Sequence, residues 1–179
     1  RIDIELCPLV GNELPVFLSQ RGYQINEFNN VSAIDLNDYK YQACSDDFNI
    51  KIIGQDKQEE WAKILAIAFG YPEARHQFFQ YIQMKGVTAF GAYHNNELIA
   101  GATIAIHDDV GDLGVTSTLP LYRSRGLQKI LLKTRLNFAK KLGLSLATVT
   151  TEPGTISDLN VQKSGFSCAY TRIKLTKLT

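Results

Sequence analysis

The sequence has few cysteines, almost no net charge and no long hydrophobic run, and each shortage argues against a class of protein. Its three cysteines, Cys7, Cys44 and Cys168, lie far apart without a C-x-x-C pair. This spacing suits neither a zinc framework nor a disulfide scaffold, and it predicts a reducing, cytoplasmic location. A formal net charge of +1 argues against a nucleic-acid partner. No apolar segment approaches the roughly 18 residues of a membrane span, so no membrane partner is expected.

The three histidines form no metal-binding pattern either. His76, His94 and His107 have no metal-ligand spacing, and no cluster of cysteines or carboxylates accompanies them. We therefore assign no metal. The remaining composition, 45% hydrophobic and 21% charged residues, is that of a globular protein with a real core. A length of 179 residues fits one domain, or one domain plus a fragment.

Hydrophobic periodicity predicts a regular order of elements in the larger, C-terminal part of the chain. We expect a strand at 48–52, helices at 61–69 and 72–84, strands at 87–93, 98–106 and 110–118, a helix at 127–142, a strand at 144–150, a helix at 157–163 and a strand at 166–175. In the long helix, Lys129, Lys133, Arg135 and Lys140 lie away from the apolar face that includes Leu131 and Leu142. Three meandering strands that lead into a parallel crossover predict an α+β fold with a mixed sheet.

The N-terminal part of the chain repeats the pattern of its C-terminal part. Matching Gly22-Tyr23 to Gly165-Phe166, an offset of 143 residues (165 − 22), also brings Gly11 onto Gly154. Both copies have the pattern of a strand, a glycine-containing loop, a short helix and a second strand. We predict that residues 1–46 are the C-terminal remnant of a first domain, whose front would lie upstream, and that residues 47–179 form a complete second domain.

The stretch from Thr118 to Leu132 has the pattern of an anion-binding loop. A strand end and a proline turn lead into a short basic loop, which enters an amphipathic helix at Gly126. The start of a helix presents unpaired backbone N–H groups and the positive end of the helix dipole. Such a position suits a pyrophosphate, and Arg123 and Arg125 can add charge-assisted contacts.

This loop resembles the coenzyme A-binding motif of the GNAT N-acetyltransferases, in which an Arg or Gln is followed by two residues, Gly, one residue, and Gly or Ala. Arg123 and Gly126 match this motif, whereas Gln128 departs from it. The element order over about residues 48–179 is also that of a GNAT domain. The segment 150–157, together with Asn160 and Gly165-Phe166, resembles the family's second cofactor motif. Tandem-domain GNAT proteins have a similar ending, which here includes Tyr170 and Arg172.

The resemblance implies a GNAT-like, mostly antiparallel central sheet with helices on both faces, and acetyl-CoA as cosubstrate. The expected site combines backbone amides that hold the diphosphate with a backbone N–H, near Ser117 and Thr118, that polarises the thioester carbonyl. The predicted cofactor-binding residues are Ser117, Thr118, Arg123, Ser124, Arg125, Gly126, Leu127, Gln128 and Asn160.

Two residues are candidates for the proton transfers. Glu152, at the end of a strand, is the candidate general base, although a solvated turn carboxylate is an equal alternative. Many GNAT enzymes carry an acidic Tyr four residues before the Gly of Gly-Phe, but Val161 stands there and cannot donate a proton. Tyr170 is the candidate replacement, and a half-buried strand tyrosine is the alternative interpretation.

Three functions remain open from the sequence, the last of which is recognition of a phosphate ester unrelated to CoA. The first is an acetyl-CoA-dependent N-acetyltransferase that acts on a primary amine of a small molecule or peptide by direct attack. The second is a catalytically silent GNAT-like module that binds CoA or a partner, which Val161 and Gln128 favour slightly. The amine and the oligomeric state, including a homodimer, stay open.

Overall fold

The computed structural model describes residues 2–43 and 48–177 and forms two compact units. One unit contains the residues up to Ile34 and those from Thr148 onward, and the other contains Asp35–Ala147. The strands are β1 (Ile2–Leu6), β2 (Gln24–Asp35), β3 (Asn49–Ile52), β4 (Val87–His94), β5 (Glu97–His107), β6 (Val110–Asp112), β7 (Thr116–Thr118), β8 (Leu146–Thr151) and β9 (Ser167–Lys177). The helices are α1 (Glu13–Gln20), α2 (Gln58–Phe69), α3 (Arg75–Ile82), α4 (Leu127–Lys141) and α5 (Ile156–Lys163), with short 3-10 turns η1 (Pro8–Val10), η2 (Gln55–Lys57), η3 (Pro72–Ala74) and η4 (Pro120–Tyr122).

The predicted α+β fold with a mostly antiparallel sheet is confirmed. In the Asp35–Ala147 unit β3 pairs with β4, β4 with β5, and β5 with both β6 and β7, always antiparallel. The tight turn between β4 and β5 has Asn95 and Asn96 in the left-handed region, with φ of 50° and 65°. Asparagine tolerates this conformation, which the hairpin requires.

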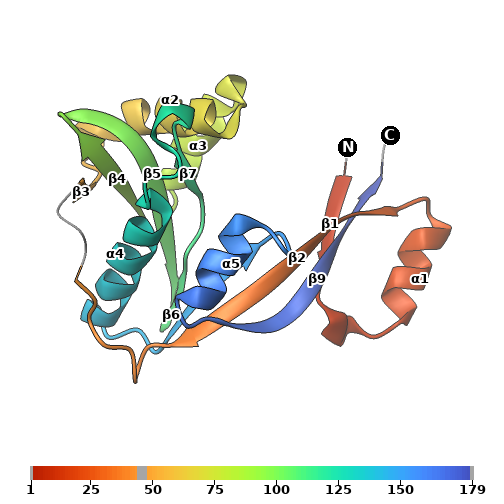
Figure 1. The fold of residues 1–179 in the computed structure, drawn as a ribbon. Helices are drawn as coiled ribbons and strands as arrows, with labels where there is room; N and C mark the ends of the chain where they lie inside the picture. The colour runs from red at the N-terminus through yellow and green to blue at the C-terminus, as the bar shows by residue number, and fades with distance from the viewer. Residues whose placement is uncertain (1, 44–47, 178–179) are drawn as a thin grey trace. The chain divides into compact units, whose positions relative to one another are not determined.

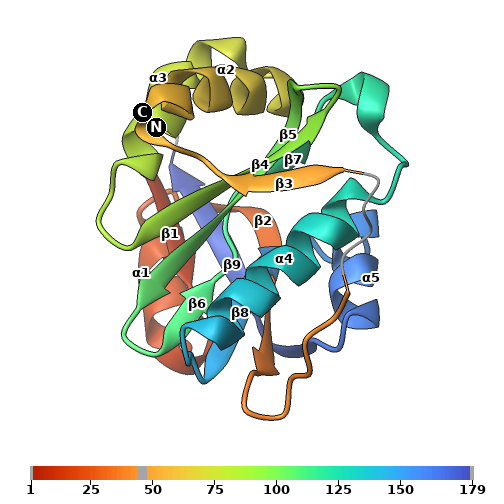
Figure 2. The same cartoon turned by 90° about the vertical axis from the view of Figure 1, so that its left-hand side faces the viewer.

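Helices cover both faces of this sheet. Ala89 of β4 belongs to a core cluster with Trp61 and Leu65 of α2, whereas the next residue, Phe90, stacks edge-on against Phe138 of α4. Because successive strand residues point to opposite faces, α2 and α4 lie on opposite sides (Figure 2). Gly101 of β5 lets α2 approach closely, since a Cβ at this position would run into the Trp61 ring.

The predicted third strand, 110–118, is interrupted. It forms β6 and β7 with Leu113–Val115 between them, and only part of the expected pairing with β5 is regular. The Gly114 carbonyl turns toward the buried guanidinium of Arg135, whose Nη1 donates to it at 3.3 Å. The break therefore exists because an internal side chain takes this carbonyl as a hydrogen-bond acceptor.

The burial of Arg135 and the exposure of Leu142 show that the faces predicted for the long helix were wrong at these two positions. Arg135, expected away from the core, is 2% exposed, whereas Leu142 is 50% exposed. Buried cations are rare unless hydrogen-bonded, and Arg135 meets that condition through backbone carbonyls. Helical spacing alone could not reveal these partners, because they lie on other elements.

The unit formed by the chain ends shows the repeated pattern at its predicted offset. Helix α1 spans residues 13–20 and α5 spans residues 156–163, which differ by the same 143 positions (156 − 13). Gly11 and Gly154 both have positive φ, 73° and 75°, as have Gly22 and Gly165. The two copies therefore share local structure as well as a sequence pattern.

The repeat gives this unit an approximate two-fold axis. Strand β9 pairs antiparallel with β2, and Asn29 lies opposite Arg172, its own equivalent in the repeat. The strands follow the order β1, β9, β2, β8. The short outer strand of each copy therefore lies beside the long strand of the other copy, β1 beside β9 and β8 beside β2. Figure 1 shows β2 and β9 side by side. The domain boundary predicted between residues 46 and 47 lies outside the described residues.

Candidate functional site

The loop predicted to bind CoA lies between β7 and α4 in the Asp35–Ala147 unit. Strand β7 pairs with β5 through Ser117 opposite Gly101 and Thr118 opposite Ala100. β7 does not belong to the continuous order of strands in the sheet, and β5 is the strand with which it pairs. The chain then makes the η4 turn, which begins at Pro120, and enters α4 at Leu127. This order of strand, turn and helix agrees with the predicted order.

The loop enters α4 through two residues in the left-handed region. Ser124 and Gly126 have positive φ, 63° and 79°, and Gly126 is the N-cap of α4. Its carbonyl accepts from the amides of Lys129 and Ile130, at 3.0 and 3.2 Å. A Cβ at Gly126 would meet no atom within 4 Å. The side of Gly126 on which a Cβ would stand is therefore open, and the helix start carries the positive end of the dipole that an anion site requires.

The two loop arginines have partners within the chain. Arg123 donates from Nη2 to the Ala68 carbonyl at 2.8 Å and from Nε to the Thr118 carbonyl at 3.2 Å. Arg125 lies over the Tyr122 ring, with its guanidinium carbon 5.1 Å from the ring centroid. Arg123 therefore ties the end of α2 to the end of β7. The predicted contacts of both arginines with phosphate stay a prediction.

Arg135 holds the backbone immediately before β7. Its Nη1 donates to the Thr103 carbonyl at 2.9 Å and to Gly114, while Nε donates to the Leu131 carbonyl at 3.1 Å. Burial lowers the pKa of Arg135 to about 10, although Asp112 and Tyr81 act in the opposite direction. The side chain remains charged at neutral pH and anchors the break between β6 and β7.

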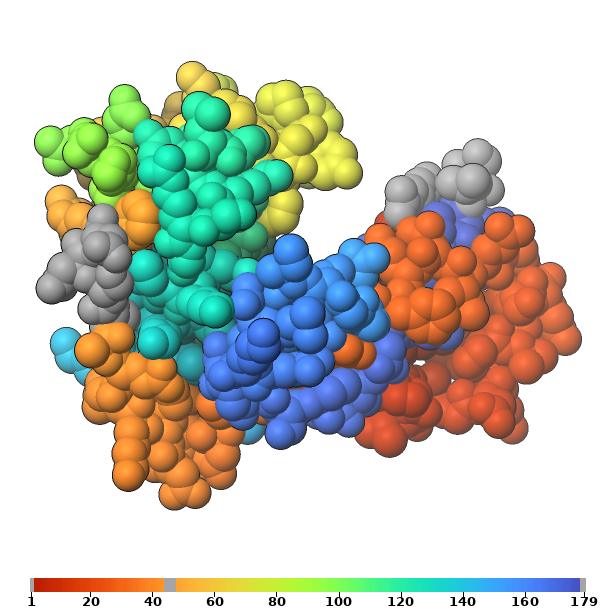
Figure 3. Space-filling view, in the orientation of Figure 1, coloured from red at the N-terminus to blue at the C-terminus, as the bar shows by residue number. Residues whose placement is uncertain are grey.

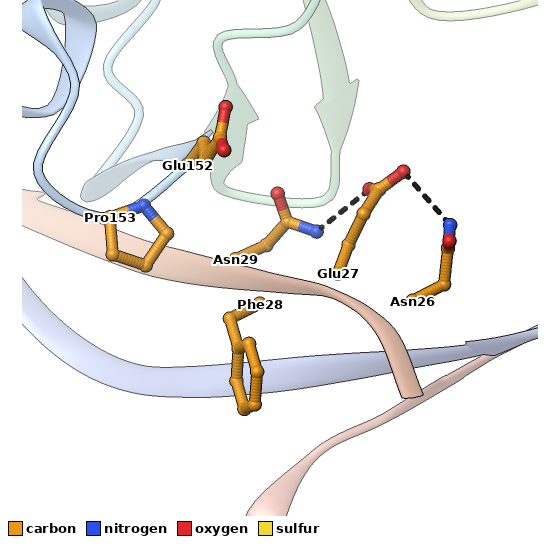
Figure 4. A pocket seen from close by; sticks show the side chains of 6 residues that line it. All are labelled: Asn26, Glu27, Phe28, Asn29, Glu152 and Pro153. Carbon is orange, nitrogen blue, oxygen red and sulfur yellow. Dashed lines mark hydrogen bonds between the residues drawn. The ribbon is translucent and has the colours of Figure 1, made fainter. Parts of the chain in front are cut away.

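A cavity of about 610 Å³ lies beside β2 in the unit formed by the chain ends (Figure 4). Its lining residues come from β2 and from the turn after β8, and they are Asn26, Glu27, Phe28, Asn29, Glu152 and Pro153. This volume is in the usual range for small-ligand pockets. The structure thus places the predicted base Glu152 at a cavity, together with a second carboxylate and two amides.

Hydrogen bonds orient the β2 side chains in this cavity. Asn29 Nδ2 donates to Glu27 Oε2 at 3.4 Å, and Asn26 Nδ2 donates to Glu27 Oε1 at 3.5 Å. Lys174 of β9 also donates to Glu27 Oε2 at 2.9 Å, an ion pair that offsets the charge of Glu27. In Figure 4 the Asn29 carbonyl oxygen is turned to the Glu152 side, whereas the Phe28 ring points to the other side of β2.

The other predicted residues of this unit are spread over α5 and β9. Tyr170 is half-buried on β9 opposite Val31, and it does not line the cavity. Asn160 lies on α5, where its carbonyl accepts from Ser164 Oγ at 2.7 Å. Val161, at the position of the family's tyrosine, is buried in the core.

A buried carboxylate joins the elements around the turn after β8. Asp158, at the start of α5, accepts from the Thr151 hydroxyl at 2.9 Å, the Gly154 amide at 3.1 Å, and the side chains of Asn30 and Gln162. Burial raises the pKa of Asp158, but these four donors outweigh it and lower the pKa below its usual value. The ionised carboxylate fixes the turn that carries Glu152.

Sequence reasoning missed Glu27, Asn29, Arg135 and Asp158. The repeat offers one signal for the first of these, because its offset matches Glu27 to the candidate acid Tyr170.

Within residues 2–43 and 48–177, no group of three or more His, Cys, Asp or Glu side chains could hold a metal ion. In the same residues, no helix has the length and apolar character needed to cross a membrane.

The model of the acetyltransferase (GNAT) family matches residues 58–166, which include the loop at Gly126. The chain belongs to the GNAT family. The match begins at α2 and ends at Phe166, so it contains β7, the η4 turn and α4 but neither β2 nor β9. No curated relative matched the sequence.

Solved structures share the fold at low identity. A GCN5-related N-acetyltransferase from Kribbella flavida is similar over 97% of this chain and 66% of its own, with a TM-score of 0.73 and 19% identity. One from Sphaerobacter thermophilus is similar over 98% and 59%, with a TM-score of 0.78 and 14% identity. A predicted acetyltransferase with acetyl-CoA from Clostridium acetobutylicum is similar over 67% and 90%, with a TM-score of 0.58 and 18% identity. The chain thus spans less than two thirds of the first two proteins.

Proposed function

We propose that this protein is an acetyl-CoA-dependent N-acetyltransferase that acts on a primary amine. The observation that carries the proposal is the loop between β7 and α4 with Gly126 as the helix N-cap, within the segment that matches the GNAT family. The fold shared with a structure that contains acetyl-CoA supports the same cosubstrate. The sequence pattern further favours a cytoplasmic protein.

Backbone amides contribute most to holding the diphosphate in this proposal. An N–H bond to a charged acceptor is worth about 1.5–3 kcal/mol, whereas a helix dipole adds about 0.3–1 kcal/mol at an exposed site. The amides from Arg125 to Gln128 serve this role. Arg123, through its bonds to the Thr118 and Ala68 carbonyls, keeps the loop in place.

The chemical step is direct transfer of the acetyl group. The amine nitrogen, after losing a proton, attacks the thioester carbonyl carbon, and the C–S bond breaks with the electron pair leaving on sulfur. The nitrogen loses a second proton as the amide forms, which balances the proton that the thiolate gains. A backbone N–H near Ser117 or Thr118 stabilises the oxygen that gains negative charge. Glu152 accepts the proton from the ammonium, and Tyr170 is the proposed donor to the departing thiolate.

A catalytically silent CoA-binding module is the second candidate, and one observation favours it. Val161 is buried in the core at the position of the family's acidic tyrosine. Release of free thiol from acetyl-CoA across a panel of amines separates the candidates. Turnover supports the enzyme, and tight CoA binding without turnover supports the silent module.

We also propose that the N-terminal copy of the repeat derives from a first GNAT-like domain. The matching bounds of α1 and α5 and the two-fold pairing of β2 with β9 support this origin. Helix α1 carries exposed apolar side chains, Val16 at 55% and Phe17 at 46%, in the red segment of Figure 3. An oligomeric state, including a homodimer, is best tested on the full-length protein by light scattering.

A matched pair of glycine variants tests the CoA site. Gly126 and Gly143 stand next to the two ends of α4, with φ of 79° and 78°, and a Cβ at either would meet no atom within 4 Å. Both alanine variants should therefore lose about 1 kcal/mol of stability through backbone strain. Titration calorimetry should show CoA binding weakened at least tenfold by Gly126→Ala and less than twofold by Gly143→Ala. Equal affinities in the two variants would count against the assigned site.

A further inference from the structure

A second, smaller cavity of about 210 Å³ lies in the groove between α2 and α3. Its lining residues are Glu59 and Ala62 of α2 and Arg75, His76 and Phe79 of α3. All five belong to the Asp35–Ala147 unit, and none belongs to the loop between β7 and α4. At roughly 30 Å³ for each water molecule, the cavity has the volume of about seven waters, which suits a ligand of about seven to nine non-hydrogen atoms.

The two helices that form this groove are held together at both ends of α2. At its first residue, Gln58 Oε1 accepts from Gln83 Nε2 at 2.5 Å, and at its last residue the Phe69 ring stacks on Phe78 at 5.5 Å. Ala62, on the cavity side, has no exposed surface and belongs to the core cluster of this unit. Figure 1 shows α2 and α3 beside each other. The cavity walls are therefore part of the packed fold, and a ligand does not have to order them first.

Three side chains with unused hydrogen-bonding capacity line the cavity. Glu59, Arg75 and His76 are exposed, and within residues 2–43 and 48–177 none of the three side chains has a hydrogen bond or an ion pair. The neighbouring carboxylate differs, because Glu60 pairs with Lys57 at 2.8 Å. The cavity thus has one carboxylate acceptor, one guanidinium with five N–H donors and one imidazole.

This set of groups matches a zwitterion better than an ion of either sign. A guanidinium can donate two parallel N–H bonds to one carboxylate, and an imidazole can donate a further bond. A ligand with a carboxylate alone would be repelled by Glu59, and a ligand with an ammonium alone would be repelled by Arg75. A ligand that has both charges meets an opposite charge at each end, and Phe79 provides an apolar wall for a small aliphatic group.

We propose that this cavity binds a small aliphatic α-amino acid, with its carboxylate at Arg75 and His76 and its ammonium at Glu59. The site is separate from the one proposed for CoA, and its ligand binding does not depend on acetyl transfer. The Ala68 carbonyl marks the end of α2 that accepts from Arg123 of the loop before α4. Glu59 stands nine residues earlier (68 − 59), roughly 13 Å along the helix axis. We therefore expect the amino acid to be bound without being acetylated.

Titration calorimetry with L-valine and two matched analogues tests the charge pattern. L-valinamide keeps the ammonium but has no carboxylate, and 3-methylbutanoate keeps the carboxylate but has no ammonium. In low-salt buffer without CoA, we expect both analogues to bind at least tenfold more weakly than L-valine. If either analogue binds as tightly as L-valine, recognition of a zwitterion is wrong.

Variants of the two charged residues assign the two ends of the ligand. Arg75→Met should weaken L-valine binding at least tenfold. Glu59→Gln should weaken L-valine binding at least fivefold, but it should bind 3-methylbutanoate as tightly as the wild type or more tightly, because the repelling charge is gone. Wild-type affinity for L-valine in both variants would overturn the proposal. Because both residues are exposed, the far-UV spectrum should stay unchanged.

Two control variants remove the same charges outside the cavity. Glu60, next to Glu59 on α2, does not line the cavity, and Glu60→Gln should change the affinity for L-valine less than twofold. The exposed Lys85 follows α3, and Lys85→Met should likewise have less than a twofold effect. Losses in the controls as large as those in Glu59→Gln and Arg75→Met would mean a general effect of net charge and would refute the site.

Thiol release separates this site from acetyl transfer. With L-valine as the single amine, thiol release from acetyl-CoA should not exceed the rate without amine. Release that depends on L-valine and is abolished by Arg75→Met would make this an acceptor site and overturn the separate ligand site. If no amine gives release but the calorimetric pattern is as expected, acetyl transfer is wrong and the amino-acid site remains.

Discussion

Replacing Arg135 by methionine separates the two opposite effects of this side chain on stability. Burial lowers its pKa from 12.5 to about 10. At about 1.4 kcal/mol per pKa unit, this corresponds to a penalty on the order of 3 kcal/mol for carrying the buried charge. The penalty is fully present at neutral pH, because folded and unfolded chains are both protonated there. It is relieved only as the pH rises above about 10, where the folded chain loses the proton first.

The hydrogen bonds of Arg135 act in the opposite direction. Without the guanidinium, the carbonyls of Thr103 and Gly114 lose a donor, at about 1–3 kcal/mol each if no other donor replaces it. The two effects largely cancel. We therefore expect Arg135→Met to lower the free energy of unfolding by no more than about 3 kcal/mol. The acetylation kcat should fall at least tenfold, because the Gly114 carbonyl no longer anchors the segment before β7.

Urea unfolding and thiol release measure the two effects on the same preparation. Lys63→Met, on the exposed side of α2, is the control for removal of a positive charge and should leave both values unchanged within error. A stability loss above about 5 kcal/mol would refute the estimated penalty for the buried charge. An unchanged kcat would show that β7 does not depend on Arg135.

Three further variants test other parts of the chain. Asp158→Asn should lower stability at pH 7 by about 2–3 kcal/mol, because its four donors lose an ionised acceptor. The wild type should lose this advantage as the pH falls below about 4 through the lowered pKa of Asp158, so urea unfolding curves of the two proteins converge there. Arg123→Glu should weaken CoA binding more than tenfold in calorimetry while the far-UV spectrum stays unchanged. Gly101→Ala should cost about 1–3 kcal/mol in thermal or urea unfolding, because its methyl group meets the Trp61 ring.

Local periodicity predicted most elements of the Asp35–Ala147 unit. Helix α2 ends at Phe69 because Gly70 takes the left-handed conformation there, with φ of 84°, and the sequence indicated this end. The hairpin at Asn95 and the start of α4 at Gly126 likewise depend on residues that are adjacent in sequence. Such features need no knowledge of the rest of the fold.

Features that depend on distant partners could not be predicted in the same way. Arg135 is buried because the carbonyls of Thr103 and Gly114 accept its donors, and helical spacing contains no information about them. The interruption of the strand at 110–118 has the same cause. The cavity beside β2 is lined by residues of β2 and of a turn more than a hundred residues away in the sequence. Only the pairing of the strands could therefore bring Glu27 and Asn29 near Glu152.

Trp61 provides an internal spectroscopic probe of one unit. It is the single tryptophan of the chain, it has no exposed surface, and its indole nitrogen donates to the Phe90 carbonyl at 2.8 Å. Its fluorescence therefore reports the environment of the Asp35–Ala147 unit, while circular dichroism averages over every helix. Superimposable melting curves from the two signals would mean cooperative unfolding of the whole chain, and a lag between them would reveal a partly folded intermediate.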